Sequence, residues 1–228
     1  MREKTLVPNS PAAARILKSV SGKGSSVGPG TFLIDASRIT ECPRRLVNGI
    51  LSPGKDILLP GELSRQAMND LNCKTMVRRL RASCDVQVMK EDYLAMDNIL
   101  GLSAYVDMVI RLDGNLMIVI FRYSSSWEMN KMSTSGPLKK DVITAVSCLF
   151  LSGIHDAVLV YSHGSSSVSF HVKRSDHIFD AVRSKARTLQ DYVMAGRLPA
   201  QCRNHRCTYC HGGQDGTRNR GTGTRSSC

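Results

Sequence analysis

GLSAYVDMVIRLDGNLMIVIFRYSSSW, residues 101–127, is the stretch that decides the fold. Residues 105–112 and 116–123 are apolar runs rich in Val, Ile and Met, and the Asp-Gly-Asn at 113–115 is typical of a tight turn. The stretch therefore predicts a β-hairpin. Asp107 lies inside its first strand, where a carboxylate is costly unless it is paired, hydrogen-bonded, bound to a metal or turned to solvent. We therefore take Asp107 as the first candidate for a functional residue.

The composition is that of a globular protein with an excess of positive charge. The chain has 228 residues, 42% of them hydrophobic, and a formal net charge of +12. This charge favours an acidic partner, most simply nucleic acid, although a basic protein without such a partner is an alternative. No apolar run reaches the ~18 residues of a transmembrane helix, and the opening MREKTLVPNS has no hydrophobic segment. We expect a cytoplasmic protein without membrane contact, whose cysteines are thiols or metal ligands rather than disulfides.

Two regions carry most of the unbalanced positive charge. One lies before the hairpin, at residues 65–90, and the other occupies residues 197–228. The candidates for contacts to phosphate groups are Arg65, Lys74, Arg78, Arg81, Arg203 and Arg206. If the fold places both regions on one surface, they form a track for DNA, including single-stranded DNA.

Apolar periodicity predicts helices before and after the central hairpin. The predicted helices cover a short segment after Asp35 or Ser37, residues 63–80 as one or two helices, 141–152, and 175–196. The predicted further strands are 86–89, 157–162 and 167–172. The polar segment 124–136 is predicted to be a loop in which Trp127, the only tryptophan, packs rather than stacks on a base. Central strands between helices predict an α/β sandwich with a mixed sheet.

The order of these elements resembles the core of the PD-(D/E)XK nucleases. A Gly before an Asp in a strand, a tight turn, and a buried strand running into three serines at 124–126 are similar to the RecB-like exonucleases. That group includes the CRISPR-associated iron–sulfur exonucleases and related phage proteins. The resemblance covers residues 31–211 and implies a restriction-endonuclease-like fold, with a mixed central sheet flanked by helices and a Cys-rich C-terminal element. Residues 1–30 then form a flexible segment and residues 212–228 a disordered basic tail.

The resemblance also locates the catalytic positions, and most of them are altered. In the family an Asp and a Glu hold a divalent cation such as Mg²⁺ or Mn²⁺, and a Lys orients the attacking water. These three positions correspond to Asp107, Phe121 and Tyr123, so only the Asp is kept. Glu91 resembles an acidic residue that often precedes the Gly-to-Asp element. It is either a residual metal ligand or an exposed carboxylate in a charged turn.

A cysteine cluster lies near the C-terminus. Cys202, Cys207 and Cys210 have the spacing C-x4-C-x2-C, and two cysteines separated by two residues can turn their thiolates toward one ion. Cys42, in the sequence Cys-Pro-Arg-Arg, resembles the first cluster ligand of the iron–sulfur exonucleases. The resemblance therefore implies a [4Fe–4S] cluster on these four cysteines. Zinc, with His205 or His211 in place of Cys42, is an alternative, and three unliganded thiols are another.

The sequence thus predicts a nucleic-acid-binding relative of these exonucleases that has lost its catalytic metal site. One alternative is an active metal-dependent DNA exonuclease, in which Asp107 binds the cation with a relocated carboxylate and Arg122 or a nearby Lys replaces the missing Lys. The candidates for that carboxylate are Glu91, Asp113 and Glu128. A second alternative is a non-enzymatic assembly protein, for example a viral component or a member of a nuclease or recombination complex, whose partner contacts would be insensitive to salt.

Overall fold

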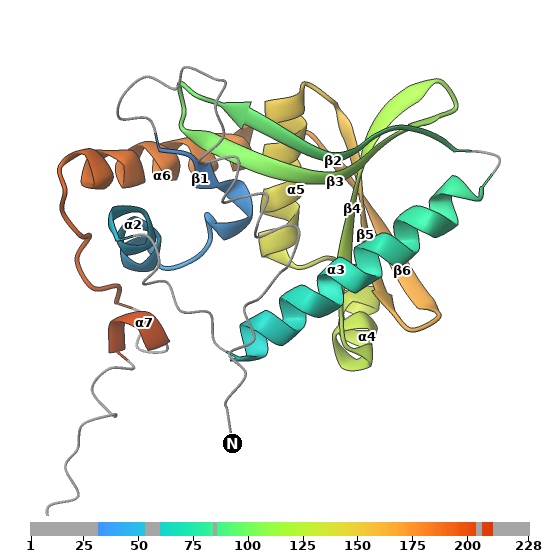
Figure 1. Cartoon of the computed structure of the whole chain (residues 1–228), viewed down its shortest axis with the longest axis horizontal. Helices are drawn as coiled ribbons and strands as arrows, with labels where there is room; N and C mark the ends of the chain where they lie inside the picture. The colour runs from blue at the N-terminus through green and yellow to red at the C-terminus, as the bar shows by residue number, and fades with distance from the viewer. Residues whose placement is uncertain (1–31, 53–59, 84–85, 204–206, 212–228) are drawn as a thin grey trace, which may run out of the picture.

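The fold is built around a six-stranded mixed sheet (Figure 1). The computed structural model describes residues 32–52, 60–83, 86–203 and 207–211. The strands are β1 (Ile34–Asp35), β2 (Gln87–Asp97), β3 (Leu102–Leu112), β4 (Asn115–Tyr123), β5 (Asp156–His163) and β6 (Ser166–Lys173). β2 pairs antiparallel with β3 along most of its length, whereas β1 and β4 pair with separate parts of β3. β4 then pairs parallel with β5, and β5 forms an antiparallel hairpin with β6.

Helices cover both faces of this sheet. They are α2 (Pro43–Leu51), α3 (Pro60–Arg81), α4 (Ser126–Ser135), α5 (Lys139–Ser152), α6 (Asp176–Met194) and α7 (Thr208–His211), with a short 3₁₀ helix, η1, at Ala36–Arg38. In Figure 1, α3 crosses the front of the sheet, and α5 lies behind it. None of the helices in the described ranges is long and apolar enough to cross a bilayer.

Two apolar cores hold these layers together. In the larger one, buried residues of α2, α5 and α6, such as Val47, Leu149 and Leu189, pack against the sheet. The smaller core lies under α3 and contains Met108 and Phe121 from the sheet. The residues of α3 that face this core are Cys73, Met76, Val77 and Leu80. They recur every three or four positions, so α3 buries one stripe and turns its basic residues outward.

The start of β3 depends on Gly101. Its φ is +57°, in the left-handed region, and a Cβ there would overlap the side-chain amide of Gln190 and lie 2.6 Å from the Phe32 carbonyl oxygen. Gln190 donates a hydrogen bond to the Leu100 carbonyl at 2.8 Å, and Ile34 donates to the Gly101 carbonyl at 2.7 Å. Glycine is therefore required where β1, β3 and α6 meet.

The predicted fold class is confirmed, and so are both hairpins and the helices over 63–80, 141–152 and 175–196. Two local predictions are wrong. The strand predicted over 86–89 runs on to Asp97 as part of β2, and the segment predicted as a loop over 124–136 contains α4.

The start of α4 shows why the loop prediction failed. Ser125 and Glu128 form a reciprocal capping box, a Ser-x-x-Glu signal that the small polar composition concealed. Trp127 was expected to pack but is 69% exposed, because it lies on the outer side of this polar helix. The predicted flexible segment 1–30 and basic tail 212–228 lie outside the described residues.

Candidate functional site

β3 and β4 separate at Asp107. Their ladder runs from the turn to the pair Met108 and Val119, after which β4 continues only alongside β5. At the fork, Asp107 Oδ2 accepts a hydrogen bond from the Phe121 backbone N–H at 2.7 Å. The carboxylate thus takes the place of a backbone carbonyl. With its side chain 15% exposed, Asp107 does not face solvent, and that alternative is wrong.

The guanidinium of Arg122 lies between two carboxylates at this fork. Arg122 Nη1 is 3.6 Å from Asp107 Oδ2, and Arg122 Nε is 3.4 Å from Asp141 Oδ1, in the first turn of α5. The same Nη1 donates to the Phe121 carbonyl at 2.8 Å. The Arg122 side chain is 22% exposed and that of Asp141 is 8% exposed. The site is therefore an internal ion-pair network in which one cation serves two anions.

Tyr161 completes this network from β5. Its hydroxyl donates to Asp141 Oδ2 at 2.8 Å and accepts a hydrogen bond from the Leu138 N–H at 3.3 Å. Burial and the nearby Asp141 carboxylate raise the pKa of Tyr161, so the phenol remains a neutral donor. Near the same fork, Asn69 of α3 accepts a hydrogen bond from the Tyr123 N–H at 2.7 Å, which holds the end of β4 against α3.

The pKa shifts in the network follow from burial and pairing. Burial raises the pKa of Asp107, although the Arg122 guanidinium and the Phe121 N–H both lower it. For Arg122, burial lowers the pKa, but Asp107 and Asp141 more than offset this effect and raise it overall. The guanidinium therefore stays charged, and Asp107 carries a desolvation cost that Arg122 offsets only in part.

Phe121 and Tyr123, which the resemblance assigns to the family's Glu and Lys positions, carry neither a carboxylate nor an amine. The Phe121 side chain is 2% exposed and packs in the smaller core under α3. The ring of Tyr123 lies 5.7 Å from that of His163. Glu91, on β2, forms a bidentate ion pair with Arg81 at 2.6 and 2.7 Å. It lies in a strand, so its placement in a charged turn is wrong, and its role as a residual ligand stays a prediction.

Two further carboxylates, Asp113 and Glu128, were candidates to replace the missing catalytic Glu beside Asp107. Asp113 lies in the turn between β3 and β4 with φ of +50°. Glu128 accepts hydrogen bonds from the Ser125 N–H and hydroxyl. It also lines a small pocket beside Arg122 and Asp141. Among the described residues, the only group of three or more Asp, Glu, His or Cys side chains close enough to share one ion is the cysteine cluster.

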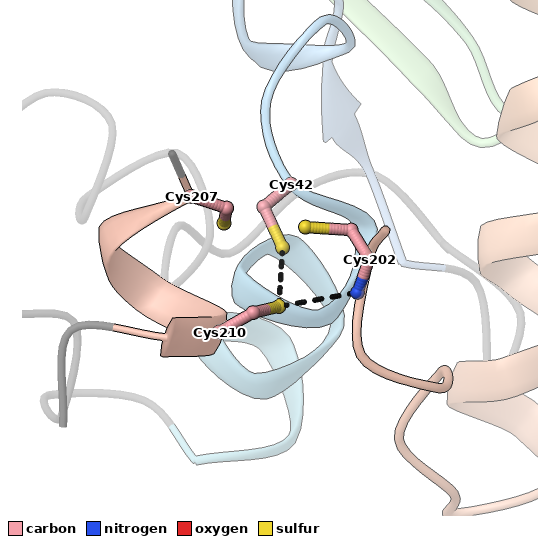
Figure 2. Close-up of side chains that lie close together, drawn as sticks. All are labelled: Cys42, Cys202, Cys207 and Cys210. Carbon is pink, nitrogen blue, oxygen red and sulfur yellow. Dashed lines mark hydrogen bonds between the residues drawn. The ribbon is translucent and has the colours of Figure 1, made fainter. Parts of the chain in front are cut away.

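The fold brings four cysteines together from distant parts of the chain (Figure 2). Cys42 precedes the first turn of α2, Cys202 follows α6, and Cys207 and Cys210 lie at α7. Their sulfur atoms all lie within 4.8 Å of one another, and those of Cys42 and Cys210 are 3.4 Å apart. Arg44 of α2 donates to a backbone carbonyl before Cys202, that of Pro199, at 2.9 Å.

This cysteine tetrad has the chemistry of a metal site. A tetrahedral ion with Zn–S bonds of about 2.3 Å separates its sulfurs by about 3.8 Å, within the spread found here. A [4Fe–4S] cluster binds each cysteine to a different iron and holds the sulfurs further apart. Burial alone would raise the pKa of Cys207, but the Cys210 N–H and the neighbouring thiols lower it to about 7. The fourth member of the tetrad is Cys42, the residue expected for a cluster, rather than His205 or His211, the residues expected in the zinc alternative. His205 lies outside the described residues.

The predicted phosphate contacts are only partly gathered on one surface. Lys74 and Arg78 are exposed on the outer side of α3 together with Arg79, whereas Arg81 pairs with Glu91. Arg203 is exposed in the segment after α6. The side chain of Arg65 and the whole of Arg206 lie outside the described part of the chain. Of the predicted contacts, Lys74 and Arg78 are thus the two that share an exposed face in the described part of the chain, that of α3.

Sequence reasoning missed Asp141, Tyr161 and Asn69. Asp141 was assigned only to the start of a helix and Tyr161 only to a strand. An Asp at the start of an otherwise apolar helix is a signal that could have identified Asp141, because a carboxylate at the edge of a core needs a partner. For Tyr161 and Asn69 the local pattern holds no comparable signal.

Comparison with known proteins identifies the class of fold. No protein-family model and no curated protein matches the chain. Among solved structures it is similar to LHK-Exo, an alkaline exonuclease from Laribacter hongkongensis, with 12% identity and a TM-score of 0.56 over 73% of this chain and 90% of that chain. It is also similar to SSO0001, with 15% identity and a TM-score of 0.54 over 89% of this chain and 91% of that chain.

The chain therefore has the same fold as LHK-Exo and SSO0001. The resemblance inferred from the central hairpin is therefore confirmed at the level of the fold.

Proposed function

We propose that this protein binds DNA through a nuclease fold without cutting it, and that an arginine replaces the catalytic metal ion. The observation that carries this proposal is the Arg122 guanidinium between Asp107 and Asp141. In the metal-dependent nucleases a divalent cation neutralises the conserved carboxylate. Here a covalently attached cation does so, and it cannot activate water or coordinate a scissile phosphate as a metal ion does.

A metal ion would have to compete with this arrangement. Mg²⁺ takes oxygen ligands at about 2.0–2.1 Å in near-octahedral geometry. Asp107 Oδ2 is already used by the Phe121 N–H and lies next to Arg122, and the side chain in the position of the second carboxylate is a buried phenyl ring. Displacing the guanidinium would also leave a buried cation without its counter-ions, which is strongly unfavourable.

DNA is the partner that the charge distribution and the exonuclease neighbour favour. LHK-Exo is an exonuclease by name. The net charge of +12 and the exposed Lys74, Arg78 and Arg79 on α3 provide the electrostatic attraction. The basic residues also lie on the opposite face of the sheet from α5 and α6, so the two helical layers can serve separate purposes.

We further infer that the cysteine tetrad holds a structural metal. The sulfur spacing favours a single zinc ion, while the family resemblance implies a [4Fe–4S] cluster. Metal analysis of protein purified without oxygen distinguishes the two. A zinc site gives about one zinc per chain and no visible absorbance, and a cluster gives iron, acid-labile sulfide and a brown colour.

The test of the proposed function incubates protein with end-labelled single- and double-stranded DNA, in either manganese or EDTA, and reads retardation and cleavage together. We expect retardation without cleavage in both conditions, weakening as salt rises. Asp107→Ala should leave the affinity unchanged. The double variant Lys74→Glu with Arg78→Glu loses two phosphate contacts. The plot of log affinity against log salt should therefore become shallower, with the magnitude of its negative slope reduced by roughly 1.4–1.8.

The matched control reverses two exposed charges away from α3, Lys173→Glu with Arg187→Glu. If it weakens binding as much as the α3 variant, the basic face of α3 is not the binding surface. Manganese-dependent degradation that disappears in Asp107→Ala would refute the inactive site and favour the exonuclease with relocated residues. Neither retardation nor cleavage would favour the assembly role.

A further inference from the structure

A groove on the face of the molecule covered by α5 and α6 has no role in the site described above. It lies between α5, α6 and the segment after η1, and its volume is about 650 Å³. Its aliphatic lining consists of Ile39, Val142, Ile143, Ile178, Ala181 and Val182. Much of the groove surface is therefore hydrocarbon exposed to water. A ligand that displaces this water gains binding free energy from the hydrophobic effect.

Three lysines and one histidine surround this aliphatic surface. Lys139 and Lys140 line it from the first turn of α5, and His177 and Lys185 line it from α6. Among the described residues, those that line the groove include no Asp or Glu and no Phe, Tyr or Trp. An occupant should therefore combine aliphatic groups with negative charge.

Lys185 is the most informative of these cations because it is half-buried. Its Nζ donates to the Glu41 backbone carbonyl at 3.2 Å. The carboxylate of Glu41 is directed elsewhere, to Arg38 at 3.1 Å and Arg45 at 4.0 Å. The hydrogen-bond acceptor of Lys185 is therefore a neutral carbonyl oxygen. A carboxylate entering the groove could form a charge-assisted hydrogen bond with this ammonium group.

We propose that this groove binds an acidic amphipathic helix of a partner protein, with aliphatic side chains on the groove floor and carboxylates facing the lysines. Grooves of this kind recognise helices by apolar residues spaced three or four positions apart. The charges decide against this chain as its own partner. A second copy carries the same net charge of +12, and its residues 212–228 contain three arginines and one aspartate.

DNA is a poorer occupant for the same groove. Single strands gain affinity from stacking of bases on aromatic rings, and among the described residues that line the groove no Phe, Tyr or Trp offers such a ring. The groove also lies on the face covered by α5 and α6, opposite the basic face of α3. A protein bound here would leave α3 accessible, so the molecule could connect a partner protein to DNA.

The test measures fluorescence anisotropy of a short labelled helical peptide with leucines along one side and glutamates flanking them, added to the full chain. Two control peptides carry lysine in place of glutamate and serine in place of leucine. We expect saturable binding of the acidic peptide only. Ala181→Glu, at an exposed position in the groove, should weaken it by about tenfold or more, because it fills the floor with a like charge.

Ser184→Glu is the matched control, since it adds the same charge to α6 at an exposed position that does not line the groove. It should change the affinity by less than about twofold. Lys139→Glu should also weaken binding, and salt should reduce it. Equal binding of the acidic and lysine peptides, or equal effects of Ala181→Glu and Ser184→Glu, would overturn the proposal. Displacement of the peptide by a DNA oligonucleotide would assign the groove to nucleic acid and also overturn it.

Discussion

Removal of the Arg122 guanidinium leaves Asp107 and Asp141 buried without their shared counter-ion. Taking away one partner of a buried ion pair costs about 3–5 kcal/mol. Arg122 is 22% exposed, and Tyr161 still donates to Asp141, so we expect the lower end, about 3 kcal/mol, for Arg122→Met. For a chain of this size each kcal/mol shifts Tm by roughly 2–4 °C, which gives a loss of about 6–12 °C.

Urea denaturation at pH 7 and pH 5 is the assay. Because the folded-state pKa of Asp107 is raised, the stability linked to its protonation is fully present below the unfolded pKa of about 3.9 and is lost as pH rises through the folded pKa. Without Arg122 that pKa rises further. The destabilisation caused by Arg122→Met should therefore be smaller at pH 5 than at pH 7.

Two further variants make this prediction refutable. Arg111→Met removes an exposed arginine of β3 and should cost less than about 0.5 kcal/mol. Adding Asp141→Asn to Arg122→Met should restore part of the loss, because asparagine still accepts the Tyr161 hydrogen bond without an uncompensated charge. Wild-type stability of Arg122→Met at pH 7, or an equal loss in Arg111→Met, would show that the guanidinium does not serve as an internal cation.

Three other predictions follow from the same structure. Manganese should raise the Tm of Arg122→Ala and leave that of the wild type unchanged, which thermal melts with and without the ion measure. Equal shifts in Tm for the two proteins would contradict the idea that Arg122 occupies a former cation site. Gly101→Ala should cost at least about 3 kcal/mol in urea denaturation, against about 1 kcal/mol for Gly114→Ala, since both have positive φ but only Gly101 is crowded. The Cys207→Ser variant should contain less zinc or iron than the wild type when its metal content is measured by plasma mass spectrometry, and it should have a lower Tm. The Cys73→Ser variant, whose change lies outside the tetrad, should keep its metal.

The parts of the fold that were predictable are those with a strong local signal. Apolar runs on both sides of Asp113-Gly114-Asn115 identify the central hairpin, because this turn chemistry and strand pattern have few alternatives. Helix α4 was missed because its buried Met132 and half-buried Met129 are too few to form a clear apolar stripe, and its capping box was overlooked. Local composition therefore predicts buried elements better than exposed ones.

The candidate site was less predictable, because its residues meet only in the folded chain. Asp107 could be identified from its apolar surroundings, and Arg122 could be considered as a substitute for a lysine. That Arg122 would pair with Asp107 and Asp141 depends on where β3 and β4 separate and on how α5 packs, and no local pattern encodes either. Cys42 was joined to Cys202 only through a resemblance, since the two are far apart in the chain.

The meeting of Cys42 with Cys202, Cys207 and Cys210 has a topological consequence. A metal ion shared by these residues would close a ring of about 160 residues that contains strands β2 to β6. Closing a ring of that size removes about 5 kcal/mol of chain entropy from the unfolded state. Neither end of the ring could fray independently, so unfolding would have to begin within it. Loss of the metal would free α2 first, and hydrogen exchange would report this as early deprotection of Pro43–Leu51.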